Sequence, residues 1–236
     1  MQRYFLKSIT DNELIFYDSD IHHIKNVMRY KIGDLIEAIW DETIYLCQIA
    51  SIEPLNVSII DTKKENRDNN IKLTIAISLV QEQKFDLILQ KLTELGVNKI
   101  IPIKTERSIV KLDDSKLLKK YQRWQNICKE ASEQSHRTNI PQIEKVLTLK
   151  ELANYDSNLK LICSLNDKTK PIKDYLKEEL QEMLFVIGPE GGFSIQEENF
   201  LMNNNFKPIS LGKRVLRVET AAIYVASIIN YVYGGW

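Results

Sequence analysis

The sequence has little cysteine, and its cysteines lie far apart. Cys47, Cys128 and Cys163 are an odd number of residues, and no CxxC pair occurs. A disulfide framework or a structural zinc site needs more cysteines at closer spacing. HExxH and other paired histidines at metal-ligating spacing are also absent. We therefore expect three reduced, structural thiols and no metal.

Long apolar runs are missing as well. No run approaches the roughly 18 residues that cross a bilayer, and the first seven residues lack the apolar core of a signal peptide. These absences predict a cytoplasmic protein that has no contact with a membrane.

Three common enzyme motifs are absent. No GxGxxG follows the first strand of the expected α/β region, which excludes the usual dinucleotide-binding fingerprint. No GxxxxGK[ST] occurs, which excludes a P-loop. No GxSxG occurs, which argues against an ordinary α/β-hydrolase.

An excess of either charge is also lacking, because 32 Lys and Arg balance 32 Asp and Glu. The chain is therefore not a general binder of polyanions. The charges are unevenly distributed, however. Residues 1–70 hold 8 basic and 12 acidic residues, whereas residues 104–137 hold 9 basic and 5 acidic ones. A nucleic-acid contact would need a local patch, and residues 104–137 are the best candidate.

The first part of the chain has the pattern of a small β-domain. Short apolar or alternating runs, separated by turn residues, predict strands, and one helix with apolar residues at helical spacing interrupts them before Arg29. A polar stretch without periodicity follows at 63–70, and this composition predicts a linker. We expect a small β-barrel over residues 1–68. The predicted strands are 4–6, 14–17, 35–40, 44–52 and 57–62.

From residue 71 the pattern alternates between strands and helices, which predicts an α/β domain with a parallel sheet over residues 71–236. The predicted strands are 72–80, 99–104, 159–165, 183–187 and 208–211. The predicted helices are 84–95, 117–136, 149–155, 172–181, 196–203 and 218–233.

Two glycine-containing strand ends lie close together in the sequence. The apolar run at 183–187 stops at a turn with three glycines and a proline, after which Ser194 and Glu197 form a capping-box pattern. The run at 211–221 again ends a strand and precedes a helix, with Arg214 and Arg217 beside it. Each feature alone is also explained as a tight turn or a solvated charge. Together they predict one ligand site at the carboxyl edge of the sheet.

These residues carry a family resemblance. The run from Ile187 to Ser194, followed by the run from Leu211 to Ala221, resembles the knotted methyltransferases of the SPOUT superfamily. More narrowly, it resembles the bacterial enzymes that methylate N3 of a uridine in small-subunit ribosomal RNA. His136 departs from the family pattern, which often has a small residue such as glycine there. Further stretches that fit the family are 3–5, 22–23, 27–29, 91–97, 106–108 and 130–137.

The resemblance implies a fold, a cofactor and partners. It implies a deep trefoil knot in the α/β domain, which is a rare exception to unknotted topology, and a PUA-like barrel that helps to dock RNA. It also implies S-adenosylmethionine as cofactor, a homodimer, and 16S ribosomal RNA, within the small subunit, as substrate. Two alternatives stay open. One is a related SPOUT methyltransferase acting on another ribosomal or transfer RNA position, and the other is a non-catalytic RNA-binding or ribosome-assembly module.

The resemblance also points to site residues. Arg217 is the candidate catalytic residue, because a cation would stabilise negative charge on the carbonyl oxygens that flank uracil N3. Glu133, Glu190 and Glu219 are possible bases, and none is assigned. The expected cofactor-binding residues are Leu165, Ile187, Gly188, Pro189, Glu190, Gly191, Gly192, Leu211, Gly212, Val215, Leu216, Thr220 and Ala221. The expected RNA-binding residues are Arg3, His22, Arg29, Arg107, Gln134 and Arg137.

Overall fold

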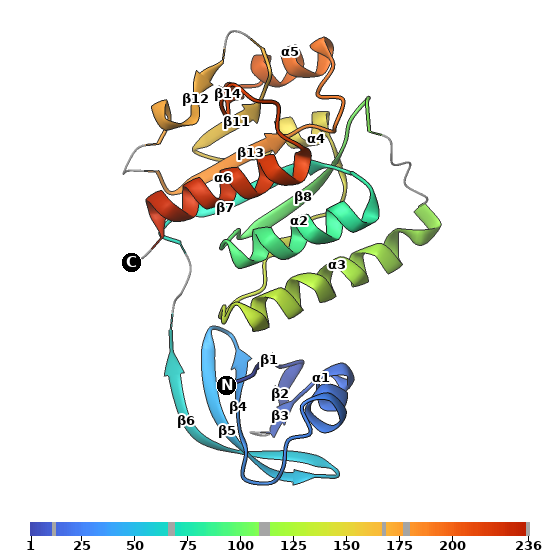
Figure 1. Cartoon of the computed structure of the whole chain (residues 1–236), viewed down its shortest axis with the longest axis vertical. Coiled ribbons are helices and arrows are strands. Elements are labelled where there is room, and N and C mark those ends of the chain that lie inside the picture. The colour runs from blue at the N-terminus through green and yellow to red at the C-terminus, as the bar shows by residue number, and fades with distance from the viewer. Residues whose placement is uncertain (11–12, 66–68, 109–113, 167–168, 177–179, 235–236) are drawn as a thin grey trace. The chain divides into compact units, whose positions relative to one another are not determined.

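The structure is a computed structural model, and it describes residues 1–10, 13–65, 69–108, 114–166, 169–176 and 180–234 (Figure 1). Lys111 of the candidate basic stretch and Trp236 lie outside these ranges.

Contacts divide the chain into two units. One unit holds Met1–Arg67 together with Lys129–Ile140, and the other holds Asp68–Cys128 and Pro141–Trp236. The predicted limits, 1–68 and 71–236, differ mainly in placing 129–140 with the α/β domain.

The N-terminal unit is mostly β-structure. Its four-stranded sheet has the order β1-β4-β5-β6, and only β1 and β4 run parallel. A separate hairpin, β2–β3, was not expected in full. The short helix α1 continues into a π-helix, η1, and the chain leaves it through Arg29, which has a positive φ of 53°. The bounds are β1 (Arg3–Phe5), β2 (Ser8–Thr10), β3 (Glu13–Ile15), α1 (Asp18–His22), η1 (His23–Val27), β4 (Leu35–Trp40), β5 (Thr43–Ile52) and β6 (Leu55–Lys64).

The C-terminal unit is built on a parallel sheet, as predicted. Its strand order is β10-β8-β7-β13-β11-β14-β12, with β9 beside β8. The strands are β7 (Lys72–Ser78), β8 (Lys99–Lys104), β9 (Gln142–Ile143), β10 (Leu147–Thr148), β11 (Leu159–Cys163), β12 (Lys170–Pro171), β13 (Glu182–Ile187) and β14 (Lys207–Ser210). The helices are α2 (Glu82–Glu94), α3 (Asp114–Gln134), α4 (Leu149–Ala153), η2 (Ile172–Asp174), α5 (Ile195–Asn203) and α6 (Val218–Tyr233).

Both faces of this sheet are covered. Alternating strand residues such as Leu73, Ile75 and Ile77 pack with α2, α3 and α6, which lie on one face in Figure 1. The residues between them, such as Ala76, pack with α4 and α5 on the other face. Central strands that are buried on both faces explain the continuous apolar runs in the sequence.

Two details of the prediction are wrong. The predicted helix at 172–181 is a single 3₁₀ turn, η2, in the described part of this segment, and Ile172 is the one buried side chain of that turn. The apolar residues of the predicted helix at 117–136 were expected to share one inward face, but Leu118 is exposed. Tyr121, Trp124 and Cys128 do face inward at helical spacing, and Leu118 lies one position away from this stripe.

Among the described residues, no helix has both the length and the apolar character needed to cross a membrane. No group of three or more His, Cys, Asp or Glu side chains in those same ranges is arranged to hold a metal ion.

Candidate functional site

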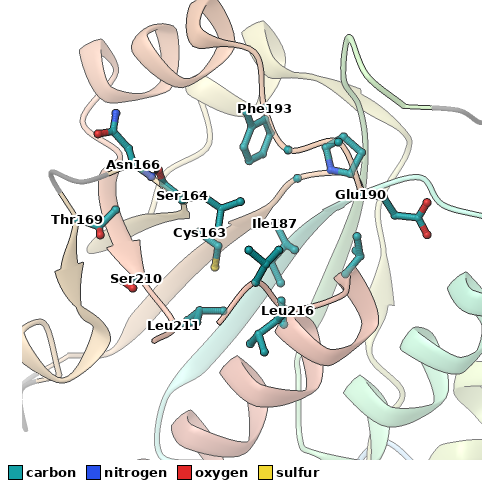
Figure 2. A pocket seen from close by; sticks show the side chains of 18 of the residues that line it. Cys163, Ser164, Asn166, Thr169, Ile187, Glu190, Phe193, Ser210, Leu211 and Leu216 are labelled. Atoms are coloured by element: carbon teal, nitrogen blue, oxygen red, sulfur yellow. Dashed lines mark hydrogen bonds between the residues drawn. The ribbon is translucent and has the colours of Figure 1, made fainter. Parts of the chain in front are cut away.

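The carboxyl ends of three neighbouring strands frame a cavity. β11 lies between β13 and β14 and pairs in parallel with both, so all three strands end at the same edge of the sheet. A cavity of about 650 Å³ opens at this edge (Figure 2). Its volume lies within the usual range for sites that bind a small molecule or cofactor.

The floor of the cavity is apolar and its rim is exposed. Ile187 ends β13 and is buried, and the side chains of Ile187 and Cys163 face the cavity in Figure 2. Burial raises the pKa of the Cys163 thiol to about 12, so this thiol stays protonated and neutral at physiological pH. Leu165 and Val215 are 72% and 75% exposed on the rim. An aromatic or aliphatic ligand group would cover these rim side chains.

The turn after β13 needs its glycines. The Gly192 N–H donates to the Pro189 carbonyl oxygen at 2.8 Å, and Gly192 has a φ of +67°. A Cβ atom on Gly188 would lie 2.9 Å from the ring of Phe193. Phe193 can therefore lie across Gly188 only because that residue has no side chain.

A second loop, between β14 and α6, forms another wall. Gly212 has a φ of +119°, and its N–H donates to Ser210 Oγ at 3.2 Å. Arg217 is the N-cap residue of α6 and is exposed, and its neighbours Leu216 and Val218 both line the cavity. The Arg217 carbonyl oxygen accepts from the Ala221 N–H at 2.8 Å, whereas the Arg217 side chain forms no hydrogen bond or ion pair with any described residue, so its guanidinium is available to a substrate.

The start of α5 is fixed by the predicted capping box. Ser194 Oγ accepts from the Glu197 N–H at 3.2 Å, and the Ser194 N–H donates to Glu197 Oε2 at 2.9 Å. The other oxygen, Glu197 Oε1, accepts from the Glu106 N–H at 2.7 Å. One carboxylate thus fixes both the helix start and the loop that follows β8.

Most of the expected cofactor-binding residues meet in this cavity. Thr220 does not line it and is exposed on α6. Arg107, expected to contact RNA, lines the cavity instead. The expected residues that do line it are Leu165, Ile187, Gly188, Pro189, Glu190, Gly191, Gly192, Leu211, Gly212, Val215, Leu216 and Ala221.

Sequence reasoning missed several lining residues. Cys163 and Ser164 end a correctly predicted strand, and the strand-end argument used for Ile187 would have found them. Asn166 and Thr169 lie in the loop that follows, where no sequence pattern marked a ligand contact. The other lining residues not expected for this site are Phe193, Glu198, Ser210, Lys213, Arg214 and Val218.

The structure corrects the role expected for Arg3, whose side chain is only 1% exposed. Its guanidinium pairs with the Glu37 carboxylate at 2.7 Å and donates to the carbonyl oxygens of His136 and Arg137. Arg3 therefore joins β1 and β4 to the segment after α3, and it is not a surface contact for RNA.

Arg137 is also buried, at 5% exposure, and its Nη2 donates to Asn139 Oδ1 at 2.7 Å. Its expected RNA contact is therefore corrected to a structural role. The preceding residue, His136, has a φ of +58° just past the end of α3. The Arg137 N–H returns to the Ser132 carbonyl oxygen and the His136 N–H to that of Glu133, which is a Schellman ending. Such an ending favours glycine, which would account for a small residue at this position in the family that the sequence resembles.

Four of the expected RNA contacts are exposed. His22, Arg29 and Gln134 lie in the N-terminal unit, the first two on or just after the α1–η1 helix and Gln134 at the end of α3. Arg107 lies in the C-terminal unit, where it also lines the cavity.

The candidate bases have different surroundings. Glu133 is buried in the N-terminal unit, where it pairs with Lys129 and accepts the Phe5 N–H at 2.9 Å, so its role is structural. Glu190 pairs with Lys84 of α2 and points away from Cys163 and Ile187 in Figure 2. Glu219 lies in the first turn of α6, and its enclosed Oε2 has no hydrogen-bond partner among the described residues.

Comparison with known proteins agrees with this architecture. The RNA methyltransferase domain family matches residues 67–230, and the RNA methyltransferase PUA domain family matches residues 16–61. Ribosomal RNA small subunit methyltransferase E of Bacillus subtilis is 35% identical over an alignment that covers 98% of this chain and 96% of that protein.

Two solved structures are also similar over almost the whole chain. A putative methyltransferase from Legionella pneumophila, in complex with the cofactor S-adenosylmethionine, has a TM-score of 0.93 at 30% identity and covers 100% of this chain and 99% of that one. Ribosomal RNA small subunit methyltransferase E from Neisseria gonorrhoeae, bound to S-adenosylmethionine, has a TM-score of 0.89 at 26% identity. The match covers 99% of this chain and 98% of that one. The chain, with its PUA domain and its RNA methyltransferase domain, belongs to the ribosomal RNA small subunit methyltransferase E family.

Proposed function

We propose that this protein uses S-adenosylmethionine to methylate N3 of a specific uridine in 16S ribosomal RNA of the small ribosomal subunit. The observation that carries this proposal is the cavity at the ends of β11, β13 and β14, whose lining includes most of the residues expected to bind the cofactor. Two relatives of the same fold have S-adenosylmethionine bound.

The cavity suits the chemistry of this cofactor. Glycines at 188, 191 and 192 let backbone N–H and C=O groups approach a ligand closely, and those groups can bond to the edges of an adenine ring. The apolar side chains of Ile187, Leu211 and Leu216 can pack on its faces. When bound, S-adenosylmethionine supplies an electrophilic methyl group on a sulfonium ion.

The residues of this chain then have to hold the uridine and stabilise charge. N3 of uracil must lose its proton before or during attack, and negative charge spreads onto the flanking carbonyl oxygens. Arg217, exposed beside the cavity, can stabilise that charge electrostatically. Holding the two reactants in line would supply much of the remaining acceleration. Glu219 is the remaining candidate for the proton acceptor that no described residue already pairs with.

The Arg217 role makes a specific prediction. Arg217→Ala should lower kcat by about 100-fold, since loss of one group that stabilises transition-state charge typically costs that much, while the Kd for S-adenosylmethionine stays the same. Arg217→Lys should recover part of the rate because it keeps the charge. Single-turnover methyl transfer and calorimetric binding measure the two effects. An unchanged rate in Arg217→Ala would remove Arg217 from the mechanism.

Methyl transfer to ribosomal subunits tests the function as a whole. Labelled S-adenosylmethionine is incubated with the protein and small subunits that lack their native modification, and the labelled nucleoside is identified by mass spectrometry. The proposal expects 3-methyluridine. Cofactor binding without label on these subunits would favour another ribosomal or transfer RNA as substrate. Neither binding nor label would favour a non-catalytic assembly module.

Three finer features belong to the same proposal. We infer a trefoil knot in the α/β domain from the family resemblance, and the strand order β13-β11-β14 and the packing of α6 against β7 and β13 are compatible with it. We infer a PUA-like barrel in the N-terminal unit that docks RNA through its exposed residues His22 and Arg29. We infer a homodimer, because α6 leaves three large side chains exposed, namely Tyr224, Tyr231 and Val232. A monomeric mass in solution would contradict the homodimer.

A further inference from the structure

Arg107 was expected to contact RNA, but its side chain is directed at the glycine turn. Its Nη1 donates to the Gly191 carbonyl oxygen at 2.9 Å and to the Phe193 carbonyl oxygen at 3.3 Å. Its aliphatic stem runs close to the same turn, because Cβ and Cδ of Arg107 lie 3.5 Å from the place where a Cβ of residue 191 would be. The guanidinium of Arg107 thus contacts the turn, and its stem leaves room there for no more than a small side chain.

The loop that carries Arg107 is itself firmly held. Thr105 Oγ1 lies 3.1 Å from Ser78 Oγ, and Ser108 Oγ donates to the Leu79 carbonyl oxygen at 2.8 Å. Ser78 ends β7, a central strand of the sheet, so these bonds fix the loop to the sheet. The Glu106 N–H bond to Glu197 fixes the same loop to the start of α5. Arg107 therefore approaches the glycine turn from a rigid support.

The two carbonyl groups that Arg107 contacts lie on either side of Gly192, the residue of the turn with a φ of +67°. Fixing both carbonyls fixes the orientation of the Gly191–Gly192 and Phe193–Ser194 peptide groups. It also holds Phe193 where its ring packs on Gly188 at the cavity wall. A turn held before the ligand arrives loses less conformational entropy on binding, which raises affinity.

We propose that Arg107 is a positioning residue for the cofactor site: it holds the glycine turn in the conformation that binds S-adenosylmethionine. This proposal rests on the proposed function in taking S-adenosylmethionine as the ligand. It assigns Arg107 to cofactor affinity, and not to RNA binding or to the chemical step.

Calorimetric binding of S-adenosylmethionine to the full chain and to three variants tests the proposal. Arg107→Ala should raise the Kd about tenfold, the scale expected when a charged hydrogen bond is lost. Arg107→Lys should fall between it and the wild type, because one ammonium group keeps the charge but cannot copy the planar fork of the guanidinium. Arg123→Ala is the matched control. Arg123 pairs with Glu82 and Asp86 and does not line the cavity, so this variant should bind like the wild type.

Steady-state kinetics and thermal unfolding separate positioning from other roles. In Arg107→Ala, the KM for S-adenosylmethionine should rise while kcat at saturating cofactor and the KM for RNA stay near their wild-type values. A wild-type Kd for S-adenosylmethionine combined with a raised KM for RNA would overturn the proposal in favour of an RNA contact. A lowered Tm with wild-type cofactor binding would overturn it in favour of a purely structural role.

The wild-type chain shows which proposal has failed. If it binds S-adenosylmethionine and Arg107→Ala binds equally well, only the positioning role is wrong. If the wild type binds S-adenosylmethionine but methylates no ribosomal RNA, the proposed function is wrong and the comparison of Kd values still decides the role of Arg107. If the wild type does not bind S-adenosylmethionine, both proposals are wrong.

Discussion

At the scale of single residues, burial decides what an arginine can do. Arg3 is enclosed with Glu37 and two backbone carbonyl groups, whereas Arg217 is exposed at the start of α6. A guanidinium loses much of its hydration when it is buried, so it needs a full set of acceptors in return. Arg3 has such a set, and removing it would leave Glu37 without its ion-pair partner.

The glycine turn gives a prediction at this scale. Gly188→Ala should weaken S-adenosylmethionine binding about tenfold, because the new Cβ would lie 2.9 Å from the Phe193 ring and push it away from the cavity wall. Arg123→Ala is again the control, since Arg123 pairs with Glu82 and Asp86 and does not line the cavity. Calorimetry with both variants measures the difference. Equal affinities would show that the position of Phe193 does not matter for the cofactor.

Much of the cavity lining could be predicted from the sequence, because it lies at strand ends marked by glycine. The buried, structural roles of Arg3 and Arg137 could not be predicted from the sequence. The partners of Arg3 lie far away in the sequence, with Glu37 34 residues and the Arg137 carbonyl 134 residues from it, and Arg137 is buried only because residues 129–140 fold with the N-terminal unit. No local pattern distinguishes such an arginine from one on the surface.

At the scale of elements, the end of α3 is tied to the N-terminal unit by buried charges. Lys129 Nζ donates to both oxygens of Asp20, at 2.7 and 2.8 Å, and to Glu133 Oε1 at 2.7 Å. Burial raises the pKa of Glu133, and the nearby ammonium group of Lys129 opposes that rise only in part. Burial lowers the pKa of Lys129, but Glu133 and Asp20 outweigh it and the net shift is upward.

Lys129→Met should lower the free energy of unfolding by about 3–5 kcal/mol at neutral pH, because two buried carboxylates lose their cation. The same change at exposed Lys119 on this helix should stay within about 0.5 kcal/mol. Urea unfolding at several pH values measures both. Equal effects at the two lysines would mean that the buried charges do not stabilise the fold.

The pH dependence of the Lys129→Met effect follows from the two shifts. The native state holds the Glu133 proton more tightly than the unfolded chain does. As the pH rises above 4.5, the ordinary pKa of a glutamate, the ionisation of Glu133 therefore lowers the free energy of unfolding. Without Lys129 this loss is larger, so the destabilisation should shrink in acid. The destabilisation should also shrink at high pH. Lys129 contributes its full stabilisation below pH 10.5, its ordinary pKa, and loses it as the pH rises through its raised pKa in the native state.

The longer elements follow closely from the sequence. β8 and α6 have their predicted bounds, because their apolar periodicity is unbroken along the whole element. The strands β9, β10 and β12 have two residues each and were not predicted. Two residues are too few to show an alternation, and such strands form only because a neighbouring strand offers its edge.

At the scale of the whole molecule, the cavity belongs to one unit, and three of the four exposed candidate RNA contacts, His22, Arg29 and Gln134, belong to the other. Every residue that lines the cavity lies in the C-terminal unit. A chain that begins at residue 70 should therefore keep its Kd for S-adenosylmethionine and lose affinity for ribosomal RNA. It should also expose the end of α3 to faster hydrogen exchange, because Lys129 and Glu133 lose Asp20 and the Phe5 N–H. Loss of cofactor binding in this chain would contradict the division of labour.

The return of residues 129–140 to the N-terminal unit has a consequence for synthesis on the ribosome. Asp20 and Arg3 are made early, but Lys129 and the carbonyl groups of residues 136 and 137 that complete their surroundings are made much later. Lys129 follows Asp20 by 109 residues and His136 follows Arg3 by 133 residues, so at a translation rate of about 5–20 residues per second the wait is roughly 5 to 27 s. During that interval the nascent chain holds an unfinished β-domain with uncompensated charges. The order of translation therefore prevents this unit from maturing before much of the next one has been made.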